Sequence, residues 1–248
     1  MHDMEVPYYE PYGLPTTVIG NPALSRNRPG DGQRFRAARG MAQDEKICLV
    51  LPGSRRSELA KVAPALLEAA KLVSSAVPGV RIIVSPSGNM AEAFDEAFPD
   101  VSGWAEVLHA PEERYDAMAA ADLALACSGT VTSELAMQGT PMIVAYRTGW
   151  LTWALARGLL YKKRYITLLN IVSDDQEIVP EFVQTRQKPD LIAETAIQWL
   201  SEPKRLQAQK EAQQAALVRM QVGGHSSAEI AAATILSVAR GQVVLTQE

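Results

Sequence analysis

Two short segments of this 248-residue chain carry residue types that bind phosphate. In the first, Leu51-Pro-Gly-Ser-Arg55, an apolar run ends in a glycine and is followed by the start of an expected helix. Backbone N–H groups at a helix start attract anions, and the fork-shaped guanidinium of Arg55 suits phosphate oxygens. The alternative is an ordinary strand-to-helix turn, with Ser54 or Ser57 as the N-cap and Glu58 supporting it. The glycine spacings of the P-loop and of the dinucleotide-binding motif are missing here.

The second segment, Ser128-Gly-Thr130, also follows an apolar run and opens an expected helix. Its two hydroxyls and unhindered glycine N–H suit a diphosphate. Glu134 lies about one helical turn further on, where its carboxylate could accept hydrogen bonds from the sugar hydroxyls of the same ligand. A capped helix with a solvated Glu134 is the alternative. Both segments end strands of one predicted parallel sheet, and the carboxyl edge of such a sheet is where ligands bind.

A third candidate is the polar stretch from Asn170 to Gln184, read as a loop leading into a short helix. Glu177, Glu181 and Gln184 would share one side of that helix, because they are spaced by four and three residues. Spacing alone favours a solvated loop and helix face.

Other residues give weaker signals. Residues 149–164 combine Trp, Tyr and Leu with a basic end, a mixture that can lie at a lipid surface but more often packs in a core. His2, His109 and His225 are isolated, so they suggest neither a metal site nor a catalytic residue.

The composition is that of an ordinary globular protein. Its 24 basic and 28 acidic side chains give a net charge of −4, so there is no electrostatic reason to expect a nucleic-acid partner. The two cysteines, Cys48 and Cys127, lie in apolar runs, which indicates a reducing compartment without disulfides. We see no secretory signal and no apolar run of the roughly 20 residues that a membrane helix needs, so we expect a cytoplasmic protein.

Strands alternating with helices predict an α/β fold, a Rossmann-like parallel sheet with helices on both faces. The expected strands are 46–51, 80–84, 105–108, 123–127 and 142–146, with a further short candidate at 16–19. An amphipathic helix follows the first strand, and Pro64 is expected to start a fresh first turn within it.

The chain divides into three expected parts. Residues 1–45 read as a connecting segment, and residues 46–188 as one Rossmann-like domain that carries the three candidate segments. Residues 189–248 read as terminal helices over 190–200, 203–220 and 226–239, with Gly223-Gly224 as a hinge.

Taken in order, these segments resemble lipid-A-disaccharide synthases, glycosyltransferases of the GT-B fold. The resemblance runs from about residue 7 to about residue 184, and more loosely through the terminal helices. Its specific parts are Leu51–Arg55, then Ser128–Thr130 with Glu134, then Pro141–Arg147, then Leu169–Gln184.

The resemblance implies a hexosyltransferase of lipid A and lipopolysaccharide biosynthesis. It would transfer a sugar from UDP-2,3-diacylglucosamine to lipid X, 2,3-diacylglucosamine 1-phosphate, with no metal and no cofactor. The family's carboxyl-terminal domain holds the donor, so the resemblance implies that residues 46–188 are a UDP-sugar-binding domain and residues 1–45 an interdomain linker. Carried over by motif, the diphosphate would be bound by Gly53, Ser54, Arg55, Ser128, Gly129 and Thr130. Glu134 would meet the ribose, and Asn170 and Gln184 would lie in the donor pocket.

The chain departs from the family pattern in three respects. Gly20-Asn21-Pro22 stands where the family has Gly-His-Pro, and Asp174-Asp175-Gln176 where it has Ala-Gly-Arg, a change expected to weaken donor binding. The amino-terminal domain, with the acceptor site and the catalytic general base, would precede Met1. We therefore expect a truncated form, inactive alone, with no catalytic residue in this chain.

Two other functions stay open. One is a related GT-B enzyme, such as the transferase of peptidoglycan lipid II synthesis or a UDP-sugar epimerase. The other is a non-catalytic nucleotide-binding remnant. Peripheral contact with the inner membrane and a homodimer are compatible with the sequence.

Overall fold

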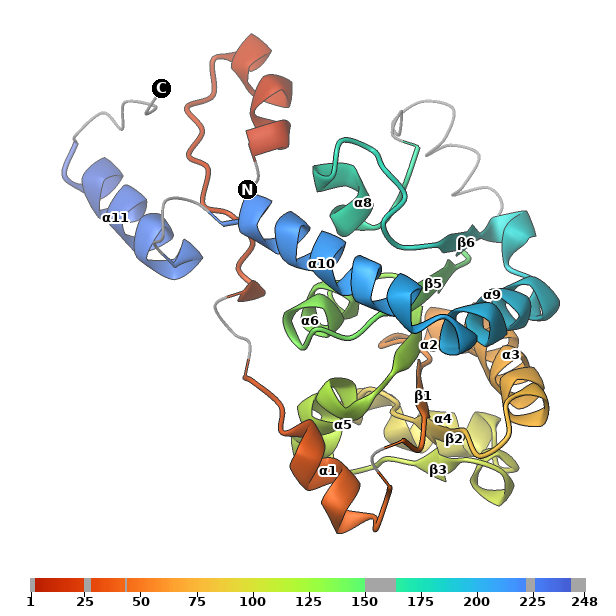
Figure 1. The fold of residues 1–248 in the computed structure, drawn as a ribbon. Coiled ribbons are helices and arrows are strands. Elements are labelled where there is room, and N and C mark those ends of the chain that lie inside the picture. The colour runs from red at the N-terminus through yellow and green to blue at the C-terminus, as the bar shows by residue number, and fades with distance from the viewer. Residues whose placement is uncertain (1–2, 25–27, 43, 150–163, 222–225, 242–248) are drawn as a thin grey trace.

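The computed structural model describes residues 3–24, 28–42, 44–149, 164–221 and 226–241. Within these ranges a six-stranded parallel sheet is covered by helices on both faces (Figure 1), which confirms the predicted fold class. The strands are β1 (Ile47–Leu51), β2 (Arg81–Val84), β3 (Glu106–Val107), β4 (Leu123–Cys127), β5 (Met142–Tyr146) and β6 (Glu181–Val183).

The strand order, β3-β2-β1-β4-β5-β6, fixes where a ligand can enter. From β1 the chain moves outward through β2 to β3, then returns to place β4 on the other side of β1 and continues outward through β5 to β6. Connections on either side of β1 and β4 therefore leave in opposite directions. The carboxyl ends of these two strands form the topological switch point, where open α/β sheets bind their ligands.

Alternating strand residues pack into two cores. Cys48 and Val50 face a core shared with α2 (Arg56–Lys61), α3 (Ala63–Ala76), α4 (Ala91–Ala97) and α9 (Pro189–Ser201). Ile47, Leu49 and Leu51 face the opposite core. That core is shared with α1 (Gly32–Ala38), α5 (Arg114–Ala120), α6 (Val131–Met137), α8 (Leu168–Val172) and α10 (Pro203–Arg219). Every residue of β1 is thus buried, as a strand covered on both faces requires.

Several local predictions are confirmed. Pro64 lies in the first turn of α3, where its missing N–H costs no helical hydrogen bond. The three terminal helices end within two residues of their predicted positions, as α9, α10 and α11 (Ser227–Ala239). Cys48 and Cys127 are buried free thiols.

The prediction for residues 170–184 is wrong. Asn170 lies inside α8, and Glu181 begins β6, paired with Val144 of β5. Gln184 then starts a short 3-10 turn, so Glu177, Glu181 and Gln184 do not share one face of a helix. The buried Glu181 carboxylate is accommodated because it accepts hydrogen bonds from the backbone N–H groups of residues 166 and 167. These distant donors make a buried acidic residue acceptable in this edge strand.

Residues 1–45 also differ from expectation. Thr16–Ile19 is not a strand, since this stretch pairs with no strand of the sheet. Residues 32–38 form α1, whose N-cap Asp31 accepts a hydrogen bond from the Arg34 backbone N–H and whose Phe35 is buried. The Arg34 guanidinium also forms an ion pair with Asp116 of α5. This helix is therefore packed onto the sheet.

Two predicted features, the aromatic residues 150–163 and the Gly223-Gly224 hinge, lie outside the described residues. In the ranges given above, no helix is long and apolar enough to cross a bilayer.

Candidate functional site

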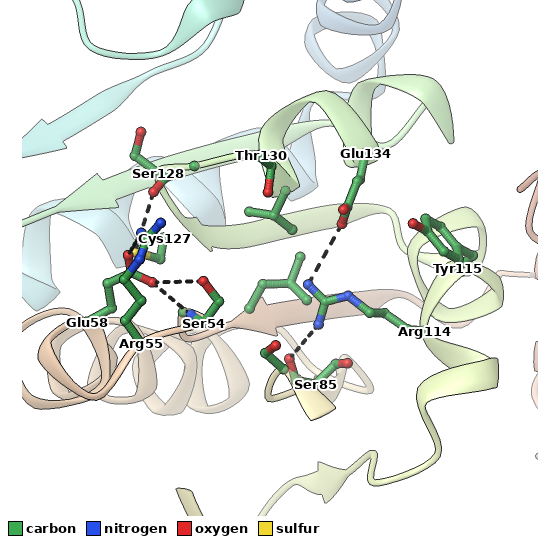
Figure 2. A pocket seen from close by; sticks show the side chains of 15 residues that line it. Ser54, Arg55, Glu58, Ser85, Arg114, Tyr115, Cys127, Ser128, Thr130 and Glu134 are labelled. Carbon is green, nitrogen blue, oxygen red and sulfur yellow. Dashed lines mark hydrogen bonds and ion pairs between the residues drawn. The ribbon is translucent and has the colours of Figure 1, made fainter. Parts of the chain in front are cut away.

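A cavity of about 220 Å³ opens at the switch point, between the carboxyl ends of β1, β2 and β4 (Figure 2). All seven residues predicted in the first two segments line it: Gly53, Ser54, Arg55, Ser128, Gly129, Thr130 and Glu134. The strand order explains why these segments meet although they lie far apart in the chain. Each follows one of the two central, adjacent strands.

The β1 loop (residues 52–55) is organised around an internal carboxylate. Glu58 is 6% exposed, and its Oε2 accepts a hydrogen bond of 2.7 Å from the Ser54 backbone N–H. Its Oε1 accepts a hydrogen bond of 2.6 Å from Nη1 of Arg55. Gly53 has a φ of 127°, and a side chain there would approach Cβ of Glu58 to 2.6 Å. Only glycine permits both this backbone conformation and this close approach.

The positive charge beside the β1 loop comes from the Arg55 side chain more than from helix dipoles. α2 and α6 have six and seven residues, so their dipoles are small. Arg55 is 73% exposed in its side chain and pairs with Glu58 through Nη1. That hydrogen bond raises the pKa of Arg55, so its guanidinium carries a full positive charge at the cavity mouth. Arg55, with no side-chain cap bond, is the N-cap of α2, so the alternative in which Ser54 or Ser57 caps this helix does not hold.

The β4 loop (residues 128–130) lies opposite. The Ser128 backbone N–H donates to Ala145 of β5, which continues the sheet pairing into the loop. Gly129 and Thr130 follow and are exposed to the cavity. Cys127 forms part of the wall, and burial raises the pKa of its thiol to about 12, with the Glu58 charge adding to the effect. The thiol therefore stays protonated near neutral pH and is not a candidate nucleophile.

Glu134 occupies the far end of the cavity with three residues that the sequence analysis did not single out. Ser85 follows β2, and Arg114 and Tyr115 begin α5. The Arg114 guanidinium lies 3.9 Å from the Glu134 carboxylate and 3.4 Å from the Ser85 carbonyl oxygen. No local sequence pattern marks Arg114, because it meets Glu134 only through the packing of α5 and α6 on the sheet.

Asn170 and Gln184 do not line this cavity. Asn170 is fully buried and ties α8 to residues 178–181 through four hydrogen bonds. Gln184 lies at the carboxyl end of β6, on the same sheet edge as the cavity but two strands from β4, and accepts a hydrogen bond from Thr148. Their role in donor binding stays a prediction.

The residues that depart from the family pattern have structural partners. Asp174 forms an ion pair with Arg219 of α10 at 2.7 Å and does not line the cavity. Asn21 contacts Ser133 of α6 through its amide, at 3.4 Å. Neither the Asp174 contact nor the Asn21 contact involves a residue of the cavity wall.

Of the three histidines, His109 lies within the described residues, and it does not line the cavity. His109 is exposed, and its Nδ1 lies 3.8 Å from a carboxylate oxygen of Asp95. Over the part of the chain that the structure describes, no three His, Cys, Asp or Glu side chains are grouped to hold a metal ion.

Comparison with known families gives this cavity a context. The family model of LpxB, lipid-A-disaccharide synthetase, matches residues 3–235. The chain belongs to this family. Curated lipid-A-disaccharide synthases agree: that of Rhodospirillum centenum is 39% identical over 209 residues, covering 83% of this chain and 51% of that protein. That of Geobacter metallireducens is 32% identical over 235 residues, covering 94% and 60%. The chain thus spans about half to three-fifths of the length of these relatives.

Solved structures share the fold at low sequence identity. A putative UDP-N-acetylglucosamine 2-epimerase from Listeria monocytogenes superposes with a TM-score of 0.56 at 14% identity, covering 83% of this chain and 48% of its own. WaaG, a glycosyltransferase involved in lipopolysaccharide biosynthesis, gives a TM-score of 0.53 at 15% identity, covering 86% and 52%. These likenesses concern the fold alone. The fold of this lipid-A-disaccharide synthase family member corresponds to about one half of each larger protein.

Proposed function

We propose that this chain binds UDP-2,3-diacylglucosamine and holds it for transfer of the diacylglucosamine unit to lipid X. One observation carries the proposal: in a member of this family, the β1 loop, the β4 loop and Glu134 meet in a single cavity at the switch point. Loop N–H groups, hydroxyls and a guanidinium at one end suit a diphosphate, and a carboxylate at the other suits a sugar diol.

In this proposal the donor's phosphates lie between the two loops. Gly53, Ser54 and Arg55 contact them from β1, and residues 128–130 contact them from β4. Glu134 accepts hydrogen bonds from the ribose. The phosphates are placed beside the start of α6 and the ribose beside Glu134, because Glu134 lies further along the same helix.

The proposed reaction is a displacement at the anomeric carbon of the donor sugar. A hydroxyl of lipid X attacks this carbon, the bond to the diphosphate oxygen breaks, and UDP leaves with the electron pair. Negative charge grows on the leaving diphosphate, and Arg55 is placed to stabilise it. The proton of the attacking hydroxyl must pass to a base, and we assign that base to none of the described residues.

Glu58 keeps Arg55 in place for this role. A guanidinium has five N–H donors, and the hydrogen bond between these side chains uses Nη1. The remaining donors can meet phosphate oxygens while Glu58 holds the side chain. Ser54 differs, because its backbone N–H donates to Glu58 at 2.7 Å, whereas its hydroxyl donates to the same carboxylate at the longer distance of 3.4 Å. We therefore expect its hydroxyl to be the group that contacts the donor.

Acylated substrates reside in membranes, so the proposal includes peripheral contact with a lipid surface. Flotation of the chain with vesicles containing lipid X, compared with vesicles lacking it, tests this contact. Association into a homodimer stays a separate prediction, which light scattering in solution tests.

Calorimetric titration with UDP tests the site. We expect binding that Arg55→Ala and Glu134→Ala each weaken about tenfold or more, the weight of one charge-assisted hydrogen bond. Arg56→Ala is the matched control, because Arg56 is an exposed neighbour that does not line the cavity. Heat absent at millimolar UDP, or equal losses from Arg55→Ala and Arg56→Ala, would contradict the proposed site.

A donor screen tests the sugar. Acylated UDP-glucosamine should bind more tightly than UDP-N-acetylglucosamine if the chain handles lipid A precursors. Preference for the unacylated sugar would point to a different UDP-sugar enzyme. With donor and lipid X together, we expect binding but no disaccharide from the chain alone, and mass spectrometry of the lipid fraction detects either result.

A further inference from the structure

Arg114 lies across the cavity from the β1 loop, at the first residue of α5 (Figure 2). Its Nη2 is 3.9 Å from Oε2 of Glu134, and its Nη1 donates to the carbonyl oxygen of Ser85 at 3.4 Å. Its side chain is 21% exposed. One guanidinium therefore spans the space between the end of β2 and α6, beside the carboxylate that lines the far end of the cavity.

This is a costly place for a cation. Burial removes much of the hydration of the guanidinium, which water would otherwise stabilise. Burial also lowers the pKa of Arg114, an effect that the Glu134 charge opposes but does not cancel. The group nevertheless stays protonated, as arginine does in proteins. Both distances given above are long for charge-assisted hydrogen bonds, so these contacts recover only part of the cost.

We propose that Arg114 is a positioning residue, which fixes the Glu134 carboxylate for recognition of the two adjacent hydroxyls of a bound ribonucleotide. This inference rests on the proposed function. A carboxylate offers about four acceptor sites on two oxygens, so Oε2 can face Arg114 while the remaining sites accept from the diol. Without Arg114, the Glu134 side chain would be free to turn toward water, and ordering it would cost binding free energy.

A direct contact between Arg114 and the phosphates is the competing role, because guanidinium groups bind phosphate well. The two roles depend on different parts of the ligand. A positioning role depends on the ribose hydroxyls and acts through Glu134. A phosphate contact depends on the diphosphate and is independent of Glu134.

The test is calorimetry on the 248-residue chain with UDP and with 2′,3′-dideoxy-UDP. We expect Arg114→Met to weaken UDP binding about tenfold, the cost of ordering a free glutamate side chain when the ligand binds, and to leave the weaker binding of the dideoxy ligand unchanged. The double variant with Glu134→Ala should bind UDP no more weakly than Glu134→Ala alone. Arg114→Lys, which keeps the charge but not the fork, should recover part of the loss.

Arg219→Met serves as the control, because it removes an arginine ion pair on α10, at a residue that does not line the cavity. It should leave both affinities unchanged. Equal losses for the two ligands, or a further loss in the double variant, would overturn the positioning role. Failure of the wild-type chain to bind UDP would overturn the proposed function and this inference together. If thermal melting shows that Arg114→Met is unfolded, the same comparisons on Arg114→Lys decide the question.

Discussion

Replacing Gly53 by alanine tests whether the β1 loop needs its present shape. Gly53 has a φ of 127°, a region that residues with a side chain rarely adopt. The added Cβ would lie 2.6 Å from Cβ and 2.9 Å from Oε2 of Glu58, closer than atoms in contact allow. The backbone and the Glu58 carboxylate must both move, and the hydrogen bond from the Ser54 N–H to that carboxylate is then lost.

Two terms set the size of the effect. The strained backbone costs about 1–3 kcal/mol. Losing a hydrogen bond to a charged group costs about 1.5–3 kcal/mol more. We therefore expect Gly53→Ala to lower the free energy of unfolding by about 4 kcal/mol. UDP binding should fall as well, because Arg55 is held by the same carboxylate.

Gly79→Ala is the control that separates the cost of backbone strain from the cost of a steric clash with Glu58. Gly79 also has a positive φ, 73°, but a Cβ there meets no atom within 4 Å. The control should lose only about 1–2 kcal/mol, the cost of a left-handed conformation, and should bind UDP normally. Urea denaturation measures the free energies and calorimetry the affinities. Equal losses of stability in the two variants, or intact UDP binding in Gly53→Ala, would refute the reasoning about this loop.

Three further predictions concern buried groups. Asn170→Ala removes four hydrogen bonds from a fully buried site and should cost about 3 kcal/mol in urea denaturation; a loss below about 1 kcal/mol would contradict this. Burial raises the pKa of Asp116, but the Asp31 backbone N–H and the Arg34 guanidinium outweigh it and leave the pKa lowered. Its stabilisation is therefore complete above about pH 4 and is lost as pH falls toward the native pKa, so Asp116→Asn should flatten acid denaturation, and an unchanged pH profile would count against it. Burial raises the pKa of Cys127 to about 12, so iodoacetamide at pH 8 should label the native thiol far more slowly than the urea-unfolded one, as mass spectrometry can show.

Three of the five strands that the sequence predicts, β1, β2 and β4, share a local signal: an apolar run that stops at a proline or at small polar residues. β1 and β4 are of this kind, and their ends carry the predicted ligand-binding segments. β6 lacks the signal, because Glu181 begins it and only a long-range set of N–H donors makes that burial acceptable. A pattern confined to neighbouring residues could not contain that information.

The same limit applies to the site. The charged residues Arg55, Glu58 and Arg114 can be read from the sequence, but the residues that each of them contacts cannot all be predicted from it. The spacing of Glu58 suggests support for the helix start, and the structure adds that it also binds the Arg55 guanidinium. Arg114 and Glu134 are brought together only by the packing of α5 and α6 on one face of the sheet. The sequence does not predict α1, because Phe35 is its only buried residue and its arginines pair with distant acids.

The adjacency of β1 and β4 has a consequence for folding. These strands are neighbours in the sheet, but two other strands and several helices separate them in the chain. Their loops can form a common cavity only after that long-range pairing has formed, so a partly folded chain cannot bind the ligand there. Any binding free energy is then added to the global unfolding equilibrium, about 2.7 kcal/mol at a ligand concentration one hundred times Kd. A nucleotide that fits this cavity should act as a folding ligand and raise the melting temperature of the whole sheet.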